Sequence, residues 1–408
     1  MRQCPKEVVP PSTQHGIQTA EANLKPISTP VQLRTTRYIT GFTHGMYRYP
    51  AAAPPDLIRE IVETYTEPGD LVLDPFVGGG TTLVEALAQG RRAVGTDANT
   101  LAIFVARAKT TPLSARAWES VYRWLAKRPL RRTQPPEVSD PRVVGLPRAL
   151  RNRLSSGLAS LEEVEHRDAR RMARCSMLRL GQWAVETQFG FDRQCYVPTV
   201  PHLERKLHLL IASAHKGMDD FVSTASRHGL SKSEIVSSRT IALSSVWEDF
   251  PPERLGLSRG SAQLVLTSPP YPGVHVLYHR WQVQSRRETA APYWVADTRD
   301  GFGASYYMMG SRTPHGQDNY FRRLTIAFGR IHRLVAADGA VVQLVAFSRP
   351  ESQLPFFLDA MDRAGFDLAA PLHQFSHELT REVANRRWYA RGRDFGGGRE
   401  VLLVHRPR

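Results

Sequence analysis

The sequence predicts an α/β protein with a Rossmann-like, mostly parallel sheet, and two stretches carry most of this prediction. Residues 71–90 begin as a short apolar strand, pass through a turn with three glycines and continue as an amphipathic helix. Residues 264–271, Leu-Val-Leu-Thr-Ser-Pro-Pro-Tyr, form an apolar strand that the two prolines must end, because proline lacks a backbone donor and fixes φ. Ligands of open α/β sheets bind at such carboxyl ends of strands, although a strand that merely enters a surface loop has the same pattern.

The composition favours a nucleic-acid partner and a reducing compartment. The 408 residues carry 54 Lys and Arg against 39 Asp and Glu, a net charge of +15, and are 41% hydrophobic. Arginine offers planar donors for phosphates and guanine edges, although a GC-rich genome also enriches arginine. Cys4, Cys175 and Cys195 lack the spacing of a zinc site or a disulfide framework, so we expect no metal. No apolar run reaches the roughly 20 residues of a membrane span and the amino terminus lacks a signal-peptide core, so we expect a cytoplasmic, nucleoid-associated protein.

The residues around the glycine turn indicate a cofactor site. The turn lacks both the lysine of a P-loop and the GxGxxG spacing of a dinucleotide site, and the acid before it, Asp74, suits a cofactor with a cationic amino group. The next strand, residues 92–97, ends in Asp97, about twenty residues past the glycines, where a carboxylate can bind a ribose diol. Asp97 could equally be the N-cap of a helix over residues 100–109. Another helix is expected over residues 55–65, before the first strand.

Two motifs resemble those of a known family. Asp-Pro-Phe-Val-Gly-Gly-Gly-Thr-Thr at residues 74–82 resembles motif I of the S-adenosylmethionine-dependent DNA amino-methyltransferases, and Thr-Ser-Pro-Pro-Tyr at residues 267–271 resembles their catalytic motif IV. The resemblance covers about two thirds of the chain. It implies a class I methyltransferase sheet whose last strand is antiparallel, S-adenosylmethionine as the cofactor and double-stranded DNA as the substrate. By this resemblance the cofactor contacts fall on Asp74, Phe76, Gly78, Gly80, Thr81 and Asp97, and on His44, Tyr49 and Pro50 in an aromatic segment before the first helix.

The strand end at Ser268 suits methyl transfer to an exocyclic amine. Such a nitrogen is a poor nucleophile because its lone pair is delocalised into the base, so the site must make it more tetrahedral. The hydroxyl of Ser268 and the carbonyl of Pro269 can accept the two amino protons, while Pro270 fixes the geometry and Tyr271 stacks on the base. The base must also leave the duplex, at a cost of a few kcal/mol.

The motif IV serine predicts the target atom by resemblance. Ser-Pro-Pro-Tyr is typical of N4-cytosine enzymes in the family, whereas Asp or Asn at the serine position is typical of N6-adenine enzymes. No Pro-Cys dipeptide stands at this strand end, so the covalent route to C5-methylcytosine has no nucleophile there. N6-adenine methylation, an RNA substrate such as tRNA, and a non-catalytic DNA-binding protein remain as alternatives. A cognate restriction or phage-defence protein would be a natural partner.

The chain divides into four predicted parts: a flexible arm (1–36), the cofactor half (37–111), a helical, arginine-rich insertion that is a candidate for target recognition (112–235) and the catalytic half (236–408). Within the catalytic half, the aromatic and arginine-rich segment 272–317 is predicted to be a loop without helical periodicity. Helices are expected over residues 118–127, 150–180, 203–221, 320–335 and 354–364, and further strands over residues 238–245, 339–347 and 400–405.

The loop and the insertion supply the candidate DNA contacts. From the loop these are His279, Arg280, Trp281, Arg286 and Arg287, and from the insertion Arg170, Arg171 and Arg174. The insertion arginines share one helix face because they recur at three- and four-residue spacing. Two structural alternatives stand beside this interpretation. The arginine face is also typical of a solvated helix balanced by Glu162, Glu163 and Glu165, and the loop could simply cap the sheet.

Overall fold

The computed structural model describes residues 41–50, 52–131, 137–187, 197–246, 248–273, 279–283, 287–300, 309–347, 350–369, 381–382 and 399–408. The predicted arm, Arg286, the side chain of Arg287, Cys4 and Cys195 lie outside the described residues.

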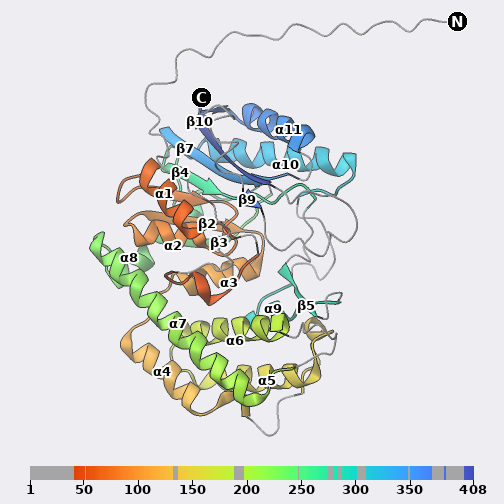
Figure 1. Ribbon diagram of the computed structural model, residues 1–408. Helices are drawn as coiled ribbons and strands as arrows, with labels where there is room; N and C mark the ends of the chain where they lie inside the picture. Colours follow the sequence, from red (N-terminus) through yellow and green to blue (C-terminus); the bar gives the residue numbers. More distant parts are fainter. Residues whose placement is uncertain are drawn as a thin grey trace, which may run out of the picture.

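One large sheet organises the described residues (Figure 1). Its strand order is β3-β2-β1-β4-β7-β10-β8, and β9 pairs with β10. Neighbours from β3 to β7 pair in parallel, whereas β10 runs antiparallel to both β7 and β8. The predicted Rossmann-like sheet with an antiparallel last strand is therefore confirmed. The strands are β1 (Leu71–Asp74), β2 (Arg92–Asp97), β3 (Arg239–Leu243), β4 (Ala262–Thr267), β7 (Val335–Ala346), β8 (Phe366–Leu368), β9 (Arg381–Glu382) and β10 (Arg399–Pro407).

Successive side chains of the central strands point to opposite faces of the sheet, and both faces are buried. Val72 and Leu264 point into one core, which they share with α1, α2 and α3, while Leu73 and Val265 point into the other, which α10 and α11 cover. Because helices lie on both faces, the central strands are apolar at nearly every position. The helices are α1 (Pro55–Tyr65), α2 (Thr81–Ala88), α3 (Thr100–Lys109), α10 (Pro314–His332) and α11 (Pro350–Arg363).

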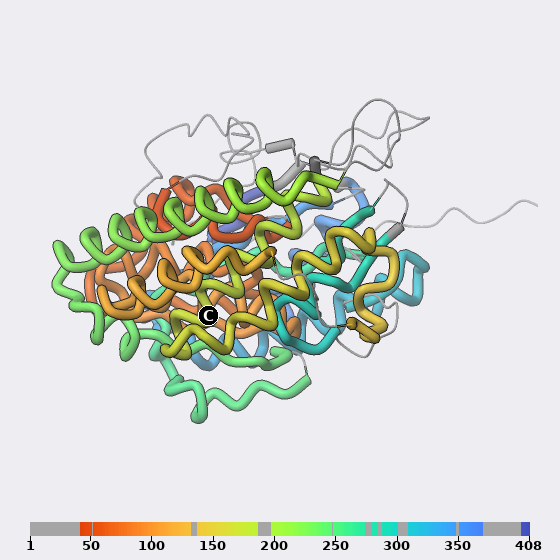
Figure 2. Tube along the Cα trace, turned by 90° about the horizontal axis from the view of Figure 1, so that it is seen from below, coloured from red at the N-terminus to blue at the C-terminus, as the bar shows by residue number. Residues whose placement is uncertain are grey.

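The residues between β2 and β3 are mostly helical and pack mainly against α2 and α3, two of the helices that cover one face of the sheet. Their apolar side chains belong to the same core as α1, α2 and α3. The long helix α7 runs beside the cofactor half, where Figure 2 shows it in light green along the orange elements. The helices are α4 (Ala115–Ala126), α5 (Arg148–Ala159), α6 (Arg167–Thr187), α7 (Val200–Arg227) and α8 (Lys232–Ser237), with the 3-10 turns η2 (Pro129–Arg131), η3 (Pro141–Val143) and η4 (Ser160–Glu163) in the same segment. Two further 3-10 turns, η1 (His44–Met46) and η5 (Glu253–Leu255), lie outside it.

Three expectations about elements are corrected. The helix expected over residues 150–180 is broken by η4, which lets Leu161 and Val164 both enter the core. The predicted loop 272–317 contains the hairpin of β5 (Trp281–Val283) and β6 (Arg287–Thr289) and a short helix α9 (Ala291–Ala296). The loop also ends early because Thr313 caps α10 by accepting a hydrogen bond from the backbone of Gly316. The remaining expected helices and strands are present, with ends that differ by a few residues.

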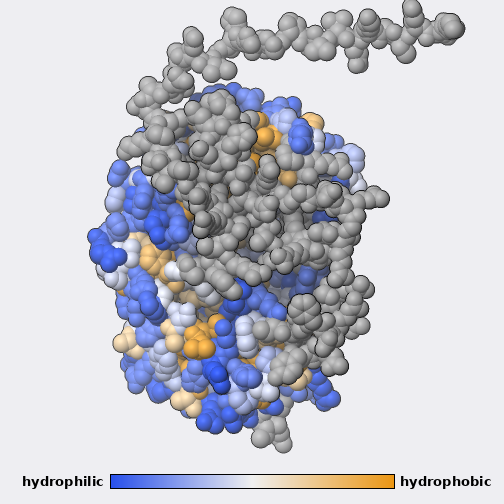
Figure 3. Space-filling view, in the orientation of Figure 1, coloured by the Kyte–Doolittle hydropathy of each residue, from blue (hydrophilic) through white to orange (hydrophobic). Residues whose placement is uncertain are grey.

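The exposed large hydrophobic side chains lie on separate elements, and the described surface in Figure 3 is mostly hydrophilic. They are Tyr122, Val144, Leu209, Val236, Leu243, Ile326 and Phe356. Among the described residues, no helix has the length and apolar content that crossing a bilayer requires.

The contact between α7 and the amino-terminal segment predicts a strong effect of one methyl group. A Cβ at Gly217 would collide with the backbone carbonyl of Phe42, so Gly217→Ala should destabilise the protein by about 1–3 kcal/mol in urea unfolding. Gly329→Ala on α10 is the matched control, because a Cβ there meets nothing within 4 Å. That control should gain about 0.5–1 kcal/mol from helix propensity. Equal effects of the two substitutions would contradict the packing described for α7.

Candidate active site

The glycine loop between β1 and α2 is shaped by left-handed backbone and close packing. Gly78 has φ of 45° and Gly80 has φ of 78°, a region that side chains disfavour. A Cβ at Gly80 would lie 3.0 Å from the Cβ of Ala106 on α3, so glycine is also required by space. The loop is tied to β2 by a 2.9 Å hydrogen bond from the amide of Val77 to the carbonyl of Thr96. Gly80 thus places the buried Thr81 at the start of α2.

Asp74 is a buried carboxylate whose described partners are all neutral. Its side chain is 4% exposed, and Oδ1 accepts hydrogen bonds from Thr267 Oγ1 at 2.6 Å and from the amide of Phe76 at 3.2 Å. Burial outweighs these hydrogen bonds and raises the pKa of Asp74 to about 6. Among the described residues, no lysine, arginine or histidine forms an ion pair with it. The carboxylate is therefore suited to a ligand that brings a positive charge.

Asp97 is held by backbone amides of the same loop. Its Oδ2 accepts from the amide of Gly78 at 2.9 Å and its Oδ1 from the amide of Asn99 at 2.8 Å. Asn99, not Asp97, caps α3, since its side chain accepts from the amide of Leu101. The alternative that made Asp97 the N-cap is therefore wrong. Desolvation raises the pKa of Asp97 to about 6, and each oxygen keeps a lone pair for a hydroxyl donor.

The aromatic segment predicted to contact the cofactor lies on the glycine loop. A Cβ at Gly79 would lie 2.7 Å from the Cβ of Tyr49, and the Tyr49 hydroxyl accepts from Asn99 Nδ2 at 3.3 Å. On its other side Tyr49 meets the ring of His279, with centroids 5.0 Å apart. The structure thus brings together Tyr49, the glycine loop and one residue of the predicted DNA-binding loop. Pro50, half-buried, follows directly.

His44 and Glu85 anchor this segment to α2. His44 Nε2 donates to Glu85 Oε1 at 2.7 Å, and Arg59 Nε donates to Glu85 Oε2 at 3.0 Å, with the side chains of His44 and Glu85 fully buried. Burial lowers the pKa of His44, so its neutral form is favoured. The described role of His44 is positioning, and its contact with a cofactor stays a prediction. Sequence reasoning missed Glu85, although a carboxylate on an otherwise apolar helix was the available signal.

The strand end at residues 267–271 lies beside the glycine loop. β1 and β4 pair in parallel, so Thr267 reaches Asp74, while Thr82 Oγ1 donates to the carbonyl of Leu266 at 3.4 Å. Ser268 is half-buried, and its hydroxyl has no hydrogen-bond partner among the described residues. Pro269 and Tyr271 are buried and Pro270 is half-buried. Thr267 belongs to the motif, but sequence reasoning gave it no role.

The described residues predicted to bind DNA make contacts within the protein. Their partners are Asp300 for Arg280 (2.6 Å), Tyr47 for the buried Trp281 (3.3 Å), Glu162 for Arg170 (2.9 Å), Asp168 for Arg171 (2.7 Å) and the carbonyl of Val295 for Arg174 (3.1 Å). Of the three insertion arginines, Arg170 pairs with one of the acids that the balanced-face alternative names, whereas Arg171 pairs with Asp168 and Arg174 donates to a backbone carbonyl. Their role in binding DNA stays a prediction.

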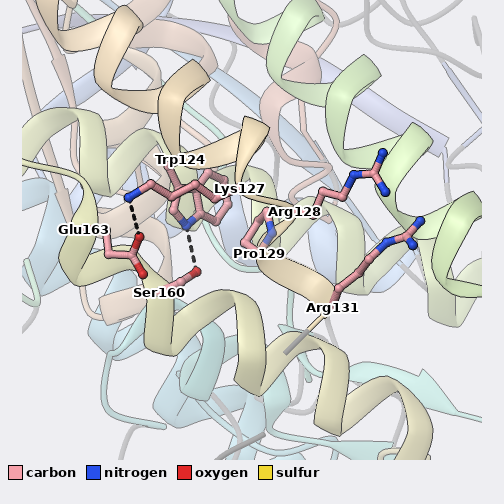
Figure 4. Close-up of a pocket in the computed structure, with 7 residues that line it drawn as sticks. All are labelled: Trp124, Lys127, Arg128, Pro129, Arg131, Ser160 and Glu163. Carbon is pink, nitrogen blue, oxygen red and sulfur yellow. Dashed lines mark hydrogen bonds and ion pairs between the residues drawn. The ribbon is translucent and has the colours of Figure 1, made fainter. Parts of the chain in front are cut away.

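A cleft of about 290 Å³ lies in the helical insertion, apart from the predicted site residues (Figure 4). Its lining residues are Trp124, Lys127, Arg128, Pro129, Arg131, Ser160 and Glu163. Two of its cations are already neutralised, Lys127 by Glu163 at 2.9 Å and Arg131 by Glu204 at 2.7 Å. None of these lining residues belongs to the predicted site.

The amino-terminal part of the chain is similar to known DNA methylases. Residues 19–106 match a family model described as DNA methylase. The chain is 42% identical over 74 residues to the type II methyltransferase M.MvaI of Kocuria varians, covering 17% of this chain and 16% of that protein. It is 41% identical over 51 residues to the DNA adenine methyltransferase YhdJ of Escherichia coli K12, covering 12% and 17%. The chain thus spans about a sixth of the length of these relatives.

Solved structures with a similar arrangement are distant. The rRNA methyltransferase aviRa of Streptomyces viridochromogenes covers 93% of this chain and 96% of its own, with TM-score 0.33 and 10% identity. A TehB-like SAM-dependent methyltransferase of Corynebacterium glutamicum covers 86% and 87%, with TM-score 0.30 and 10% identity. S-adenosylmethionine is the cofactor that the methylase match and the two buried carboxylates indicate. The residues fit it, since Asp74 suits its amino group and Asp97 its ribose.

The burial of Asp74 predicts that its charged form lowers the stability of the protein when no cofactor is bound. The folded pKa near 6 lies above the unfolded value of about 4, so stability falls as pH rises between these values. Asp74→Asn should therefore raise the free energy of unfolding by about 1–3 kcal/mol at pH 7 and by much less at pH 4, measured in urea without cofactor. The exposed carboxylate variant Glu119→Gln is the control and should change neither. A destabilised Asp74→Asn at pH 7 would show that the charge is compensated in the fold.

Proposed function

We propose that the protein is a site-specific DNA methyltransferase that transfers a methyl group from S-adenosylmethionine to the exocyclic N4 amino group of cytosine. The observation that carries this proposal is the 2.6 Å hydrogen bond from Thr267 to Asp74. It ties the carboxylate of the cofactor half to the residue immediately before Ser268. A donor group bound at Asp74 and an acceptor amine bound at Ser268 would then be neighbours.

Residues of the cofactor half fit S-adenosylmethionine as the methyl donor. When bound, S-adenosylmethionine supplies an electrophilic methyl group on a sulfonium. On the protein side, Asp74 accepts from the amino group, Asp97 accepts from the ribose hydroxyls, and Gly78 lets the backbone approach closely. Phe76 and Thr81 line the same loop, and Tyr49 covers it beside Gly79. The carboxylates of Asp74 and Asp97 would thus accept hydrogen bonds from the cofactor in place of hydrogen bonds from water.

Residues 268–271, directly after β4, fit an amine as the methyl acceptor. The free hydroxyl of Ser268 and the carbonyl of Pro269 can accept the two amino protons, which leaves the nitrogen lone pair directed at the methyl group. Pro269 and Pro270 restrict the backbone, so the two acceptors are positioned before the substrate arrives. The buried ring of Tyr271 provides a stacking surface for a flipped base.

The proposal also specifies the substrate, duplex DNA, and the target base, cytosine. The net charge of +15 and the match of residues 19–106 to DNA methylases support duplex DNA. Ser268 supports cytosine by the family resemblance, whereas the similarity to an adenine methyltransferase of Escherichia coli favours N6-adenine as the second candidate. The relatives named as type II methyltransferases support a partner nuclease, and a DNA substrate would keep the protein at the nucleoid.

The modified nucleoside decides between the two targets. The purified protein is incubated with duplex DNA and isotopically labelled S-adenosylmethionine, and the digested DNA is examined by mass spectrometry. We expect labelled N4-methylcytosine. Labelled N6-methyladenine would overturn the cytosine assignment, and label in tRNA alone would overturn the DNA assignment. Heat-treated protein is the control for non-enzymatic methylation.

Ser268→Ala should reduce turnover without loss of cofactor binding. Removing one of two preorganised acceptors should lower kcat by about 10²–10³-fold, while the dissociation constant for S-adenosylmethionine stays within about twofold. Calorimetry measures the binding and single-turnover methylation measures the rate. Ser258→Ala, at an exposed serine before β4, is the matched control and should retain full activity. Unchanged turnover in Ser268→Ala would remove this hydroxyl from the mechanism.

A further inference from the structure

Lys109 is a buried lysine with no counter-charge. It is the last residue of α3 and is 2% exposed. Among the described residues, no carboxylate pairs with it and no group accepts a hydrogen bond from it. Burial lowers the pKa of Lys109 to about 8, so the side chain is still protonated at pH 7. A buried ammonium without a partner is unfavourable, which calls for an anionic ligand.

The ammonium group lies against the glycine loop. Nζ of Lys109 is 3.6 Å from the position that a Cβ on Gly79 would occupy, and the Cβ of Tyr49 is 2.7 Å from the same position. Gly79 and Tyr49 belong to the two segments that meet at the proposed cofactor site. The glycine loop therefore has a positive charge from Lys109 beside it and a negative charge from Asp74 at its start.

The nearby groups do not supply that anion. Burial raises the pKa of the Cys175 thiol to about 12, so Cys175 stays neutral beside Lys109. Glu85 is already bound by His44 and Arg59. Other cations close to the site have their own partners, since Arg280 pairs with Asp300 at 2.6 Å.

We propose that Lys109 binds the carboxylate of the amino-acid end of S-adenosylmethionine and makes the site selective for cofactors that carry it. The inference rests on the proposed function. The amino-acid end of this cofactor is a zwitterion, and Asp74 matches only its ammonium. Lys109 provides the opposite charge across the same loop. The backbone amides at the start of α2 are the competing donors for this carboxylate, because the cap residue Gly80 has no side chain that could accept from them.

Two ligands and one substitution test the assignment. Calorimetry or quenching of intrinsic fluorescence gives the dissociation constants of S-adenosylmethionine and of decarboxylated S-adenosylmethionine, which lacks only the carboxylate. The wild type should bind the complete cofactor about 10–100-fold more tightly. Lys109→Met should lose about this factor for S-adenosylmethionine, keep its affinity for the decarboxylated ligand, and so bind both about equally.

The controls separate binding from folding. Lys127→Met removes an exposed, surface-paired lysine and should keep the wild-type preference. Thermal unfolding without ligand checks that Lys109→Met is folded, and we expect it to be at least as stable because a buried charge has been removed. A wild type that binds the two ligands equally overturns the proposal without any variant. A Lys109→Met protein that keeps the preference also overturns it and assigns the carboxylate to the amides of α2. Binding of neither ligand by the wild type would instead overturn the proposed function.

Discussion

The structure depends on one buried hydrogen bond, from Thr267 to Asp74, which joins residues 193 positions apart. It forms because β1 and β4 are parallel neighbours, so their carboxyl ends meet at one edge of the sheet. The helical residues between β2 and β3 leave and return without disturbing that pairing. The bond joins the two segments of the candidate site, because the glycine loop follows Asp74 and Ser268 follows Thr267.

Asp74 and Lys109 are buried, Asp97 is half-buried, and none of these three ionisable groups forms an ion pair among the described residues. Asp74 and Asp97 have pKa values raised to about 6, and Lys109 has a pKa lowered to about 8, which all indicate charged groups removed from water. The fold tolerates them because the sheet and the two apolar cores supply the stability. By contrast, the buried Glu85 is fully paired. Glu85 is thus a structural group, whereas Asp74, Asp97 and Lys109 are the groups for which we propose ligand contacts.

The sequence predicted those elements whose geometry depends on residues adjacent in the chain. The proline before α1, the glycines of the loop and the prolines after β4 fix backbone geometry by themselves, so these elements were found. The three-residue strand β8 and the β5–β6 hairpin depend on partners distant in sequence and were missed. Thr267 and Lys109 gained their roles only through tertiary neighbours. Arg174 of α6 shows the same limit, because its partner, the carbonyl of Val295, lies 121 residues away. By contrast, the pair of Arg171 with Asp168 follows the three-residue spacing of a helix.

Helix α6 of the insertion contacts two segments that flank the candidate site, so the proposed target recognition would be linked to the proposed chemistry. On one side, Cys175 of α6 donates to the carbonyl of Met46 at 3.8 Å, in the aromatic segment that covers the glycine loop. On the other side, Gly181 of α6 packs directly against the ring of Trp281, in the hairpin that follows residues 267–271. Because α6 touches both segments through close-packed contacts, a shift of this helix would move Tyr47 and Trp281 together, since they share a hydrogen bond. A helix that reads DNA from this position would therefore be coupled to the site by packing alone.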